Sequence, residues 1–150
     1  MKTTLALCLL TLISGALIPV QAACNAALSK SLGVNVPYTA LAVFLIGVLA
    51  SAVGVIVTGA TRPTLAAFSG APTWAYLSGA IITFYIFTIT FVAPRLGVGT
   101  AIALIVTGQI LAALIIDHFG LMRSLVCPMT LARAAGATLM VVGAFIALRR

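Results

Sequence analysis

The chain has 150 residues, of which 63% are apolar and only 6% are charged, with eight basic residues against a single acidic one. Soluble domains carry about 25% charged residues, so this chain cannot cover a water-facing surface, and lipid must be its solvent. Its net charge of +7 is spread singly over short connectors. Because there is no basic helix face or aromatic–basic ladder, we expect no nucleic-acid partner.

Five apolar runs follow one another along the chain, each close to the roughly 20 residues that a membrane-spanning helix requires. They cover about 4–28, 38–59, 73–93, 99–119 and 130–148. No connector is long enough for a soluble domain, and the runs lack the alternation of barrel strands. Since backbone groups in lipid must be paired internally, the runs predict helices. We therefore expect an all-α polytopic membrane protein, with residues 1–150 forming one transmembrane domain of five helices.

The start of the first run imitates a secretory signal. Lys2 precedes an apolar stretch, and Val20-Gln21-Ala22 precedes Ala23 in the manner of a cleavage site. The apolar run continues past this point, so we expect residues 1–22 to be retained. Sequencing the N-terminus of the purified protein tests this expectation, because cleavage would give a start at Ala23.

The residues that usually carry enzymatic or metal chemistry are scarce. Cys8, Cys24 and Cys127 show neither CxxC spacing nor a neighbouring pair of histidines. We therefore predict no structural disulfide and no metal site. The chain also lacks a nucleophile–base set and a phosphate-binding loop. It is not expected to be an enzyme or to bind a cofactor.

A polar group lies within the first run. Pro19 has no N–H, so the carbonyl of Gly15 loses its helical partner. Gln21 and Asn25 follow, four residues apart and on one helix face. Pro19, Gln21 and Asn25 are predicted either to line a polar substrate pocket or to form an interhelical hydrogen-bond clamp, as amides often do in membranes.

Two more polar side chains are expected near the middle of spans. Gln109 needs a partner in the bilayer centre, and it is either pocket-lining or bonded to another helix. Tyr85 lies mid-span with Thr83 and Thr88 nearby. Its ring is a candidate for lining a cavity and stacking on a cation, and the alternative is a packed or lipid-facing ring.

Asp117 is the only acidic residue, and His118 follows it near the end of the fourth run. Ionisable groups within spans are functional candidates, and a histidine titrates near neutral pH. The pair is therefore a candidate for proton coupling. A local cap, or a salt bridge from Asp117 to Arg123 or Arg133, is the favoured alternative.

Small residues recur at helical spacing in the second and fifth runs. They are Gly47, Ser51, Gly54, Gly136 and Gly143. Such residues let two helix backbones approach closely, so they predict helix-packing faces. The pattern does not say whether these faces pack within one chain or between chains.

The basic residues divide evenly between the two sides of the membrane. With Met1 in the cytoplasm, the inside set is Lys2, Arg62, Arg123 and Arg133, and the outside set is Lys30, Arg95, Arg149 and Arg150. Membrane proteins are oriented by an excess of Lys and Arg in cytoplasmic loops. Four against four gives no firm bias, so we expect the chain to insert in both orientations and to pair with itself antiparallel.

Three groups of short motifs stand in a distinctive order over nearly the whole chain. They are Gly15-Ala16-x-x-Pro19-x-Gln21-Ala22-x-x-Asn25, then Pro94-x-Leu96-Gly97 leading to Gly108-Gln109, then Ile116-Asp117-His118-Phe119-Gly120. Together they resemble the YdcZ-like inner-membrane family, which is placed near the drug/metabolite transporter superfamily. The resemblance implies a bacterial cytoplasmic membrane and an antiparallel arrangement, since that family includes dual-topology proteins, oppositely oriented pairs and fused ten-helix forms. It transfers no catalytic residues.

Two hypotheses for function follow. The first is a small-metabolite or drug transporter in which two inverted five-helix chains form a ten-helix inverted repeat around a midplane site. The pocket residues named above suit a small polar or weakly cationic substrate. The alternative is a non-transporting scaffold or subunit of a larger membrane complex, as the small-residue faces and scarce polar groups allow. Uptake into proteoliposomes, compared with a Gln109→Leu variant, distinguishes the two.

Overall fold

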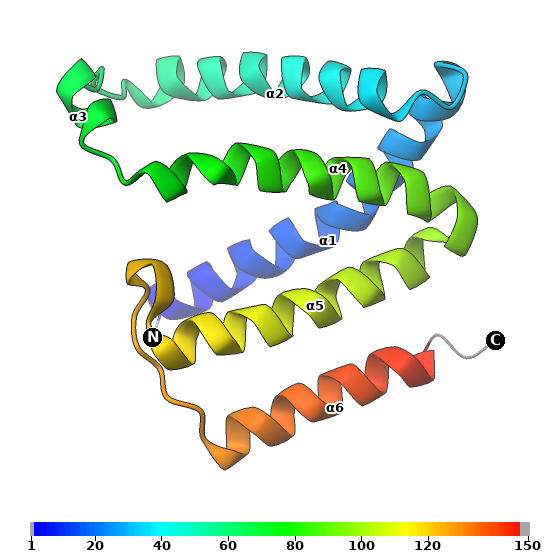
Figure 1. Ribbon diagram of the computed structural model, residues 1–150, viewed down its shortest axis with the longest axis vertical. Helices are drawn as coiled ribbons and strands as arrows, with labels where there is room; N and C mark the ends of the chain where they lie inside the picture. The colour runs from blue at the N-terminus through cyan, green and yellow to red at the C-terminus, as the bar shows by residue number, and fades with distance from the viewer. Residues whose placement is uncertain (1, 148–150) are drawn as a thin grey trace. The chain divides into compact units, whose positions relative to one another are not determined.

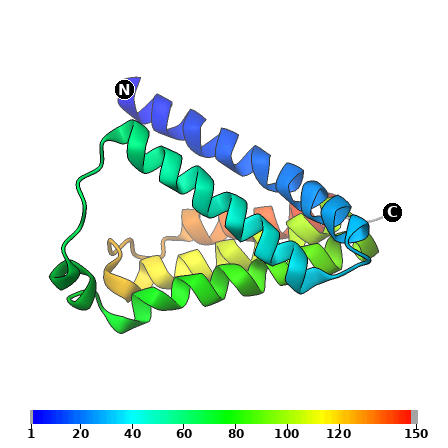
Figure 2. The same ribbon diagram turned by 90° about the horizontal axis from the view of Figure 1, so that it is seen from above.

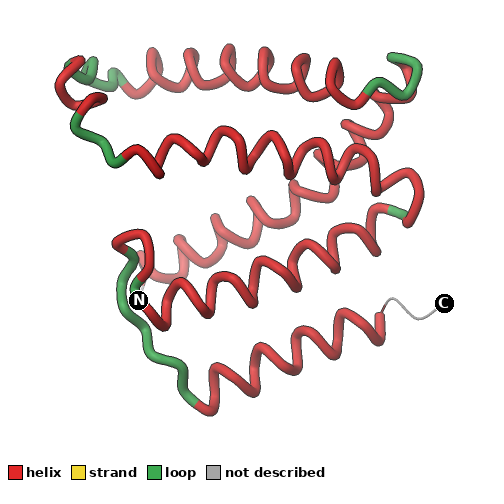
Figure 3. The backbone as a smooth tube through the Cα atoms, viewed as in Figure 1, coloured by secondary structure: helices red, strands yellow, loops and turns green. Residues whose placement is uncertain are grey.

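The computed structural model describes the backbone of residues 2–147 and the side chains of residues 4–146. Over this part of the chain every regular element is a helix, drawn in red in Figure 3, and no strand is present. The all-α prediction is therefore confirmed. Met1, Leu148, Arg149, Arg150 and the side chain of Lys2 lie outside what is described.

The chain forms two compact units, Met1–Arg95 and Leu96–Arg150, and each is described by itself. The first unit contains three long helices and two short ones, which can be followed in Figure 1 from blue to green. They are α1 (Lys2–Ser31), α2 (Val36–Thr58), α3 (Leu65–Ser69), the 3₁₀ turn η1 (Thr73–Tyr76) and α4 (Leu77–Leu96).

Two helices continue through a proline. α1 contains Pro19 and reaches Ser31, and α4 contains Pro94 and reaches Leu96. Both extend beyond the boundaries predicted from the sequence, at residues 28 and 93. A proline removes one helical hydrogen bond, but its fixed φ near −65° is compatible with a helix. Each proline therefore leaves a carbonyl without a donor, at Gly15 and Thr90 respectively, and the helix goes on.

The ends of α2 are set by local chemistry. Asn35 caps its first turn, because its side-chain oxygen accepts a hydrogen bond from the backbone N–H of Tyr38 at 3.3 Å. At the other end Gly59 adopts a left-handed conformation with φ 60°, which glycine tolerates without steric cost. The short helix α3, which was not expected, is capped in the same way by Thr64.

α1 and α2 meet at the connector that joins them, which is seen at the right of Figure 2, and they diverge from it in the view of Figure 1. The side chains from Thr4 to Ile18 on α1 and from Leu45 to Thr58 on α2 are all exposed. The buried residues of this unit lie instead on three short stripes. These are Ala22, Asn25 and Ser29 on α1, Thr39 and Ala40 on α2, and Ile86, Ile89, Thr90 and Ala93 on α4.

The predicted packing face of α2 is uncovered within the described chain. A Cβ built at Gly47 or Gly54 would meet no described atom within 4 Å, and Ser51 is exposed. The same openness holds for Gly136 and Gly143 on the last helix. The described chain therefore leaves these small-residue faces free, and their role in helix packing stays a prediction.

The second unit contains α5 (Val98–Phe119), the 3₁₀ turn η2 (Leu121–Arg123) and α6 (Leu131–Ala147). α5 and α6 lie against each other. α6 has 17 described residues, about 25 Å at 1.5 Å per residue, slightly less than the roughly 30 Å hydrocarbon core. Its predicted last residue, Leu148, is not described.

Four helices are long and apolar enough to cross a bilayer. They cover Thr4–Ser31, Val36–Thr58, Thr73–Leu96 and Val98–Phe119, and α6 is a shorter apolar helix. Large apolar side chains are exposed along all of them, for example Leu12 at 69% and Ile56 at 78%. Such surfaces are stable against lipid and not against water. The chain is therefore a polytopic membrane protein.

Candidate functional site

A cavity opens where the C-terminal parts of α1 and α4 come together with the connector that follows α1. Its volume is about 540 Å³, which is within the range of small-molecule sites. Its wall includes Ser29 and Lys30 from α1 and Thr90, Pro94 and Arg95 from α4. Both helices thus contribute a polar side chain and a cation to one space.

Thr90 differs from the other hydroxyl residues of the long helices. Its side chain is 2% exposed, and Oγ1 has no hydrogen-bond partner among the described residues. Thr83, two turns earlier on α4, donates to the Gly79 carbonyl at 2.7 Å, the usual arrangement for a helical threonine. A buried unpaired hydroxyl costs about 1–3 kcal/mol. Thr90 therefore keeps a hydrogen-bonding group uncommitted in the cavity wall.

Arg95 is held in place by its own helix. Its Nη1 donates to the Phe91 carbonyl, and its Cζ lies 3.6 Å from the centre of the Phe91 ring. This cation–π contact fixes the guanidinium plane while leaving further N–H donors. The end of α4 thus presents a positioned cation to the cavity that Lys30 also lines.

The connector beside this cavity is strained. Gly33 and Val34 have φ values of 70° and 62°, and the left-handed region is unfavourable for a β-branched residue such as valine. The Val34 N–H donates to the Ser29 carbonyl at 2.7 Å, which holds the turn. Strain of this kind costs about 1–3 kcal/mol and often marks functional sites. Val34 also lines the cavity.

A second polar cluster ties the end of α5 to the start of α6. Arg133 donates from Nη2 to Asp117 Oδ2 at 2.7 Å and from Nη1 to the Cys127 carbonyl at 2.6 Å. The Cys127 N–H donates in turn to the Asp117 carbonyl at 2.9 Å. One arginine thus connects a helix end, the connector and the next helix. We call this set of bonds the α5–α6 latch.

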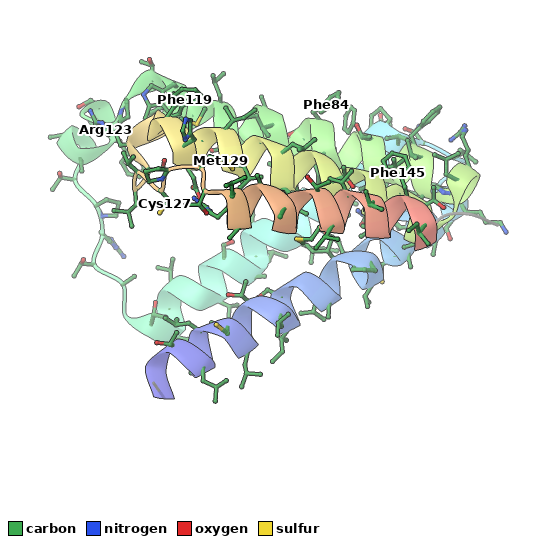
Figure 4. The ribbon with its side chains drawn as sticks, turned by 90° about the horizontal axis from the view of Figure 1, so that it is seen from below. Phe84, Phe119, Arg123, Cys127, Met129 and Phe145 are labelled. Atoms are coloured by element: carbon green, nitrogen blue, oxygen red, sulfur yellow. The ribbon has the colours of Figure 1, made fainter. Side chains whose placement is uncertain are left out.

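His118 belongs to the latch as a hydrogen-bond acceptor. Its Nδ1 accepts from the Met129 N–H at 3.0 Å, so the ring proton of the neutral form is on Nε2. Figure 4 shows Phe119, Arg123, Cys127 and Met129 gathered about this connector. The turn begins at Gly120, whose φ of 60° ends α5. The Asp117-His118-Phe119-Gly120 segment therefore ends one helix and anchors the following turn.

Comparison with known families gives a match over most of the chain. The family model described as "Putative inner membrane exporter, YdcZ" matches residues 6–146, which is nearly the whole chain. The chain belongs to the YdcZ family. No curated protein and no solved structure matches the chain significantly.

Membership of the YdcZ family confirms the family resemblance that was inferred from the short sequence motifs. It also makes the chain a multi-pass protein of the bacterial inner membrane, in agreement with the apolar helices. The family is described as an exporter family and not as an enzyme family.

The predicted substrate-binding residues are dispersed in the structure of this YdcZ-family chain. On α1, Pro19 and Gln21 are half-buried, and Asn25 is 3% exposed with its Nδ2 unpaired among the described residues. On α4 Tyr85 is half-buried, and on α5, in the other unit, Gln109 is exposed. None of the five lines the cavity between α1 and α4. Their role in substrate binding stays a prediction.

The interhelical clamp is not closed within the described chain, because Asn25 Nδ2 has no partner there. The salt bridge, in contrast, is present, and Arg133 is the partner of Asp117 out of the two arginines considered.

Sequence reasoning missed the cavity between α1 and α4. The available signal was that Lys30 and Arg95 stand at the ends of alternate spans, which reach the same side of a membrane.

Replacing Gly120 by alanine is expected to destabilise the protein more than replacing Gly59. Both glycines have φ 60°, so each alanine costs about 1–2 kcal/mol in backbone strain. A Cβ at Gly120 would also lie 2.6 Å from Val126 Cγ2, whereas one at Gly59 would meet nothing within 4 Å. We expect the Gly120→Ala change to cost about 1 kcal/mol more.

Thermal unfolding of both variants in the same detergent measures this difference, with Gly59→Ala as the matched control. Equal decreases in the midpoint for the two variants would contradict the close approach of the connector to Gly120.

Proposed function

We propose that this chain is one half of a transporter of the drug/metabolite superfamily, working as an antiparallel dual-topology homodimer. Two copies, each with five spans, form a ten-helix inverted repeat that alternates access to a site near the membrane midplane. Its cargo is a small polar or weakly cationic molecule, and the direction is export, as the family description suggests.

The even split of basic residues carries this proposal. Arg133 was the uncertain member of the split, because a basic residue deep in a span would not count toward either side. It is the third residue of α6, and its guanidinium bonds to the Cys127 carbonyl in the preceding connector. Arg133 therefore counts with that connector, and the split is four against four.

The uncovered small-residue face of α2 supports pairing with a second copy of this chain. The Gly47–Ser51–Gly54 face of α2 meets nothing within the described chain. A second, inverted copy provides a packing surface for this face, where the described chain provides none.

Labelling of Cys127 tests the dual topology with a residue that the chain already contains. Cys127 is exposed in the α5–α6 connector. In a variant with Cys8→Ala and Cys24→Ala it is the only cysteine. A membrane-impermeant maleimide added to intact cells should label about half of the molecules, and permeabilisation should expose the rest, because neither orientation is favoured.

A cytoplasmic protein with one exposed cysteine serves as the control for membrane integrity. Labelling of nearly all or almost none of the Cys127 from outside would mean one fixed orientation, and the antiparallel homodimer would be wrong.

A further inference from the structure

We propose that the cavity between the C-terminal parts of α1 and α4 binds an oxyanion, a carboxylate or phosphate group, through Lys30, Arg95 and the Thr90 hydroxyl. The site lies within one chain and does not require transport or the antiparallel dimer. It also differs from the midplane pocket of the proposed function in its residues and in the charge of its ligand.

Charge is the first argument. Two cationic side chains, Lys30 and Arg95, line one cavity, and residues 1–95 contain no acidic residue that could neutralise them. The single acidic side chain of the chain, that of Asp117, is engaged by Arg133 in the other unit. Two cations that line one cavity repel each other and both attract an anion, which offsets the repulsion when it binds. A bound oxyanion is the counter-ion that this unit lacks.

The uncommitted hydroxyl is the second argument. The Thr90 side chain is only 2% exposed and lines the cavity. Its Oγ1 has no hydrogen-bond partner among the described residues. A hydroxyl that donates to a charged oxygen makes one of the stronger protein hydrogen bonds. The cost of leaving Thr90 unpaired is offset when an anion accepts from it.

The arrangement of Arg95 is the third argument. Stacking on the Phe91 ring, with one N–H bound to the Phe91 carbonyl, orients the guanidinium before any ligand arrives. Its remaining N–H groups form the planar fork that matches a carboxylate or a phosphate. Because the side chain is already ordered, binding costs less conformational entropy.

Position in the membrane decides how a ligand reaches the cavity. α1 and α4 are the first and third spans, so their C-terminal ends, with Lys30 and Arg95, lie at the same membrane surface. A dissolved small anion and the phosphate of a lipid headgroup both reach this depth. The two sources share one chemistry and require separate experiments.

For the dissolved source, the probe is inorganic phosphate added to the full-length protein in detergent, with sodium chloride at equal ionic strength as the reference. Phosphate should raise the unfolding temperature of the wild type. Lys30→Gln and Arg95→Gln should each raise the apparent Kd about tenfold. Thr90→Val keeps the shape of the side chain and should raise it about threefold to tenfold.

Arg62→Gln is the matched control, because Arg62 is a basic residue of the same unit that does not line the cavity. Its phosphate response should equal that of the wild type. Size-exclusion profiles and unfolding without phosphate show that each variant is folded.

For the lipid source, the probe is phosphatidylglycerol or phosphatidylcholine in nanodiscs, with the retained lipid counted by native mass spectrometry. Retention of phosphatidylglycerol that disappears in Lys30→Gln and Arg95→Gln, but not in Arg62→Gln, supports an oxyanion site occupied by a headgroup. The proposal is overturned if neither probe distinguishes the cavity variants from the wild type and from Arg62→Gln.

Discussion

Adding two lysines at one terminus is expected to abolish transport by the protein when that variant is expressed alone. Two lysines after Met1 change the split to six against four in favour of a cytoplasmic N-terminus, and two after Arg150 favour the opposite orientation. Because the excess of basic residues sets the orientation of a membrane protein, each variant should insert in one direction. A single orientation provides no antiparallel partner.

Expressing the two lysine variants together should restore activity, since each supplies the orientation that the other lacks. The measurement is uptake of a screened substrate into proteoliposomes, together with co-purification of differently tagged copies. Insertion of two serines at the same positions is the control for the added length. Suppose that Cys127 labelling shows one lysine variant to have a single orientation. Full activity of that variant alone would then show that the antiparallel dimer is not the transporting species.

The helices were the most predictable part of this molecule. In lipid the backbone pairs its N–H and C=O groups only in helices or closed barrels. The five apolar runs lack the alternation of barrel strands, so they determined the fold class. The helix ends were less predictable. Pro94 was expected to end the third span, but α4 reaches Leu96, because the fixed φ of proline is compatible with a helix and only one helical hydrogen bond is lost.

The α5–α6 latch was predictable in part. A lone carboxylate near two arginines predicted an ion pair, and Arg133 is its partner. The pattern did not predict that the same guanidinium would bond to the Cys127 carbonyl, or that His118 would accept from the Met129 N–H. Those bonds depend on the left-handed turn at Gly120, Met122 and Arg123. Only glycine adopts this conformation often enough to be read from a sequence.

The cavity was not predictable, because it depends on which faces of α1 and α4 meet. Sequence reasoning selected Gln21, Asn25 and Tyr85 for their polarity within spans, and the structure places them outside the cavity wall. Lys30 and Arg95 were counted as orientation signals alone. Their meeting in one space follows from the packing of two helices, and helix periodicity in a nearly uniform apolar sequence carries little information about that packing.

Breaking the Asp117–Arg133 pair is expected to loosen the second unit without changing how uptake responds to a pH gradient. The side chains of the pair are 34% and 36% exposed, so solvent screening limits the coupling between them to about 0.5–1 kcal/mol. Arg133→Leu also removes the bond to the Cys127 carbonyl. It should therefore cost about 1 kcal/mol more than Asp117→Asn, whose amide oxygen still accepts from Arg133.

A double-mutant cycle of Asp117→Asn and Arg133→Leu, followed by unfolding in detergent, measures this coupling. The matched control is Arg123→Leu, which changes the other arginine of the connector; Arg123 makes no ion pair with Asp117. Because the amide still accepts from Arg133, the cycle measures what the charge of Asp117 adds to the 2.7 Å contact. A coupling close to zero would mean that this charge contributes nothing to stability.

The same Asp117→Asn variant separates a structural carboxylate from a proton carrier. If the Asp117 carboxylate only bridges α5 to α6, its role is to accept a hydrogen bond from Arg133. The amide oxygen of the Asp117→Asn variant can accept the same bond. Uptake by the variant in proteoliposomes should therefore respond to a pH gradient as the wild type does, at temperatures where both are folded. Loss of that response in a variant as stable as the wild type would instead assign Asp117 to proton coupling.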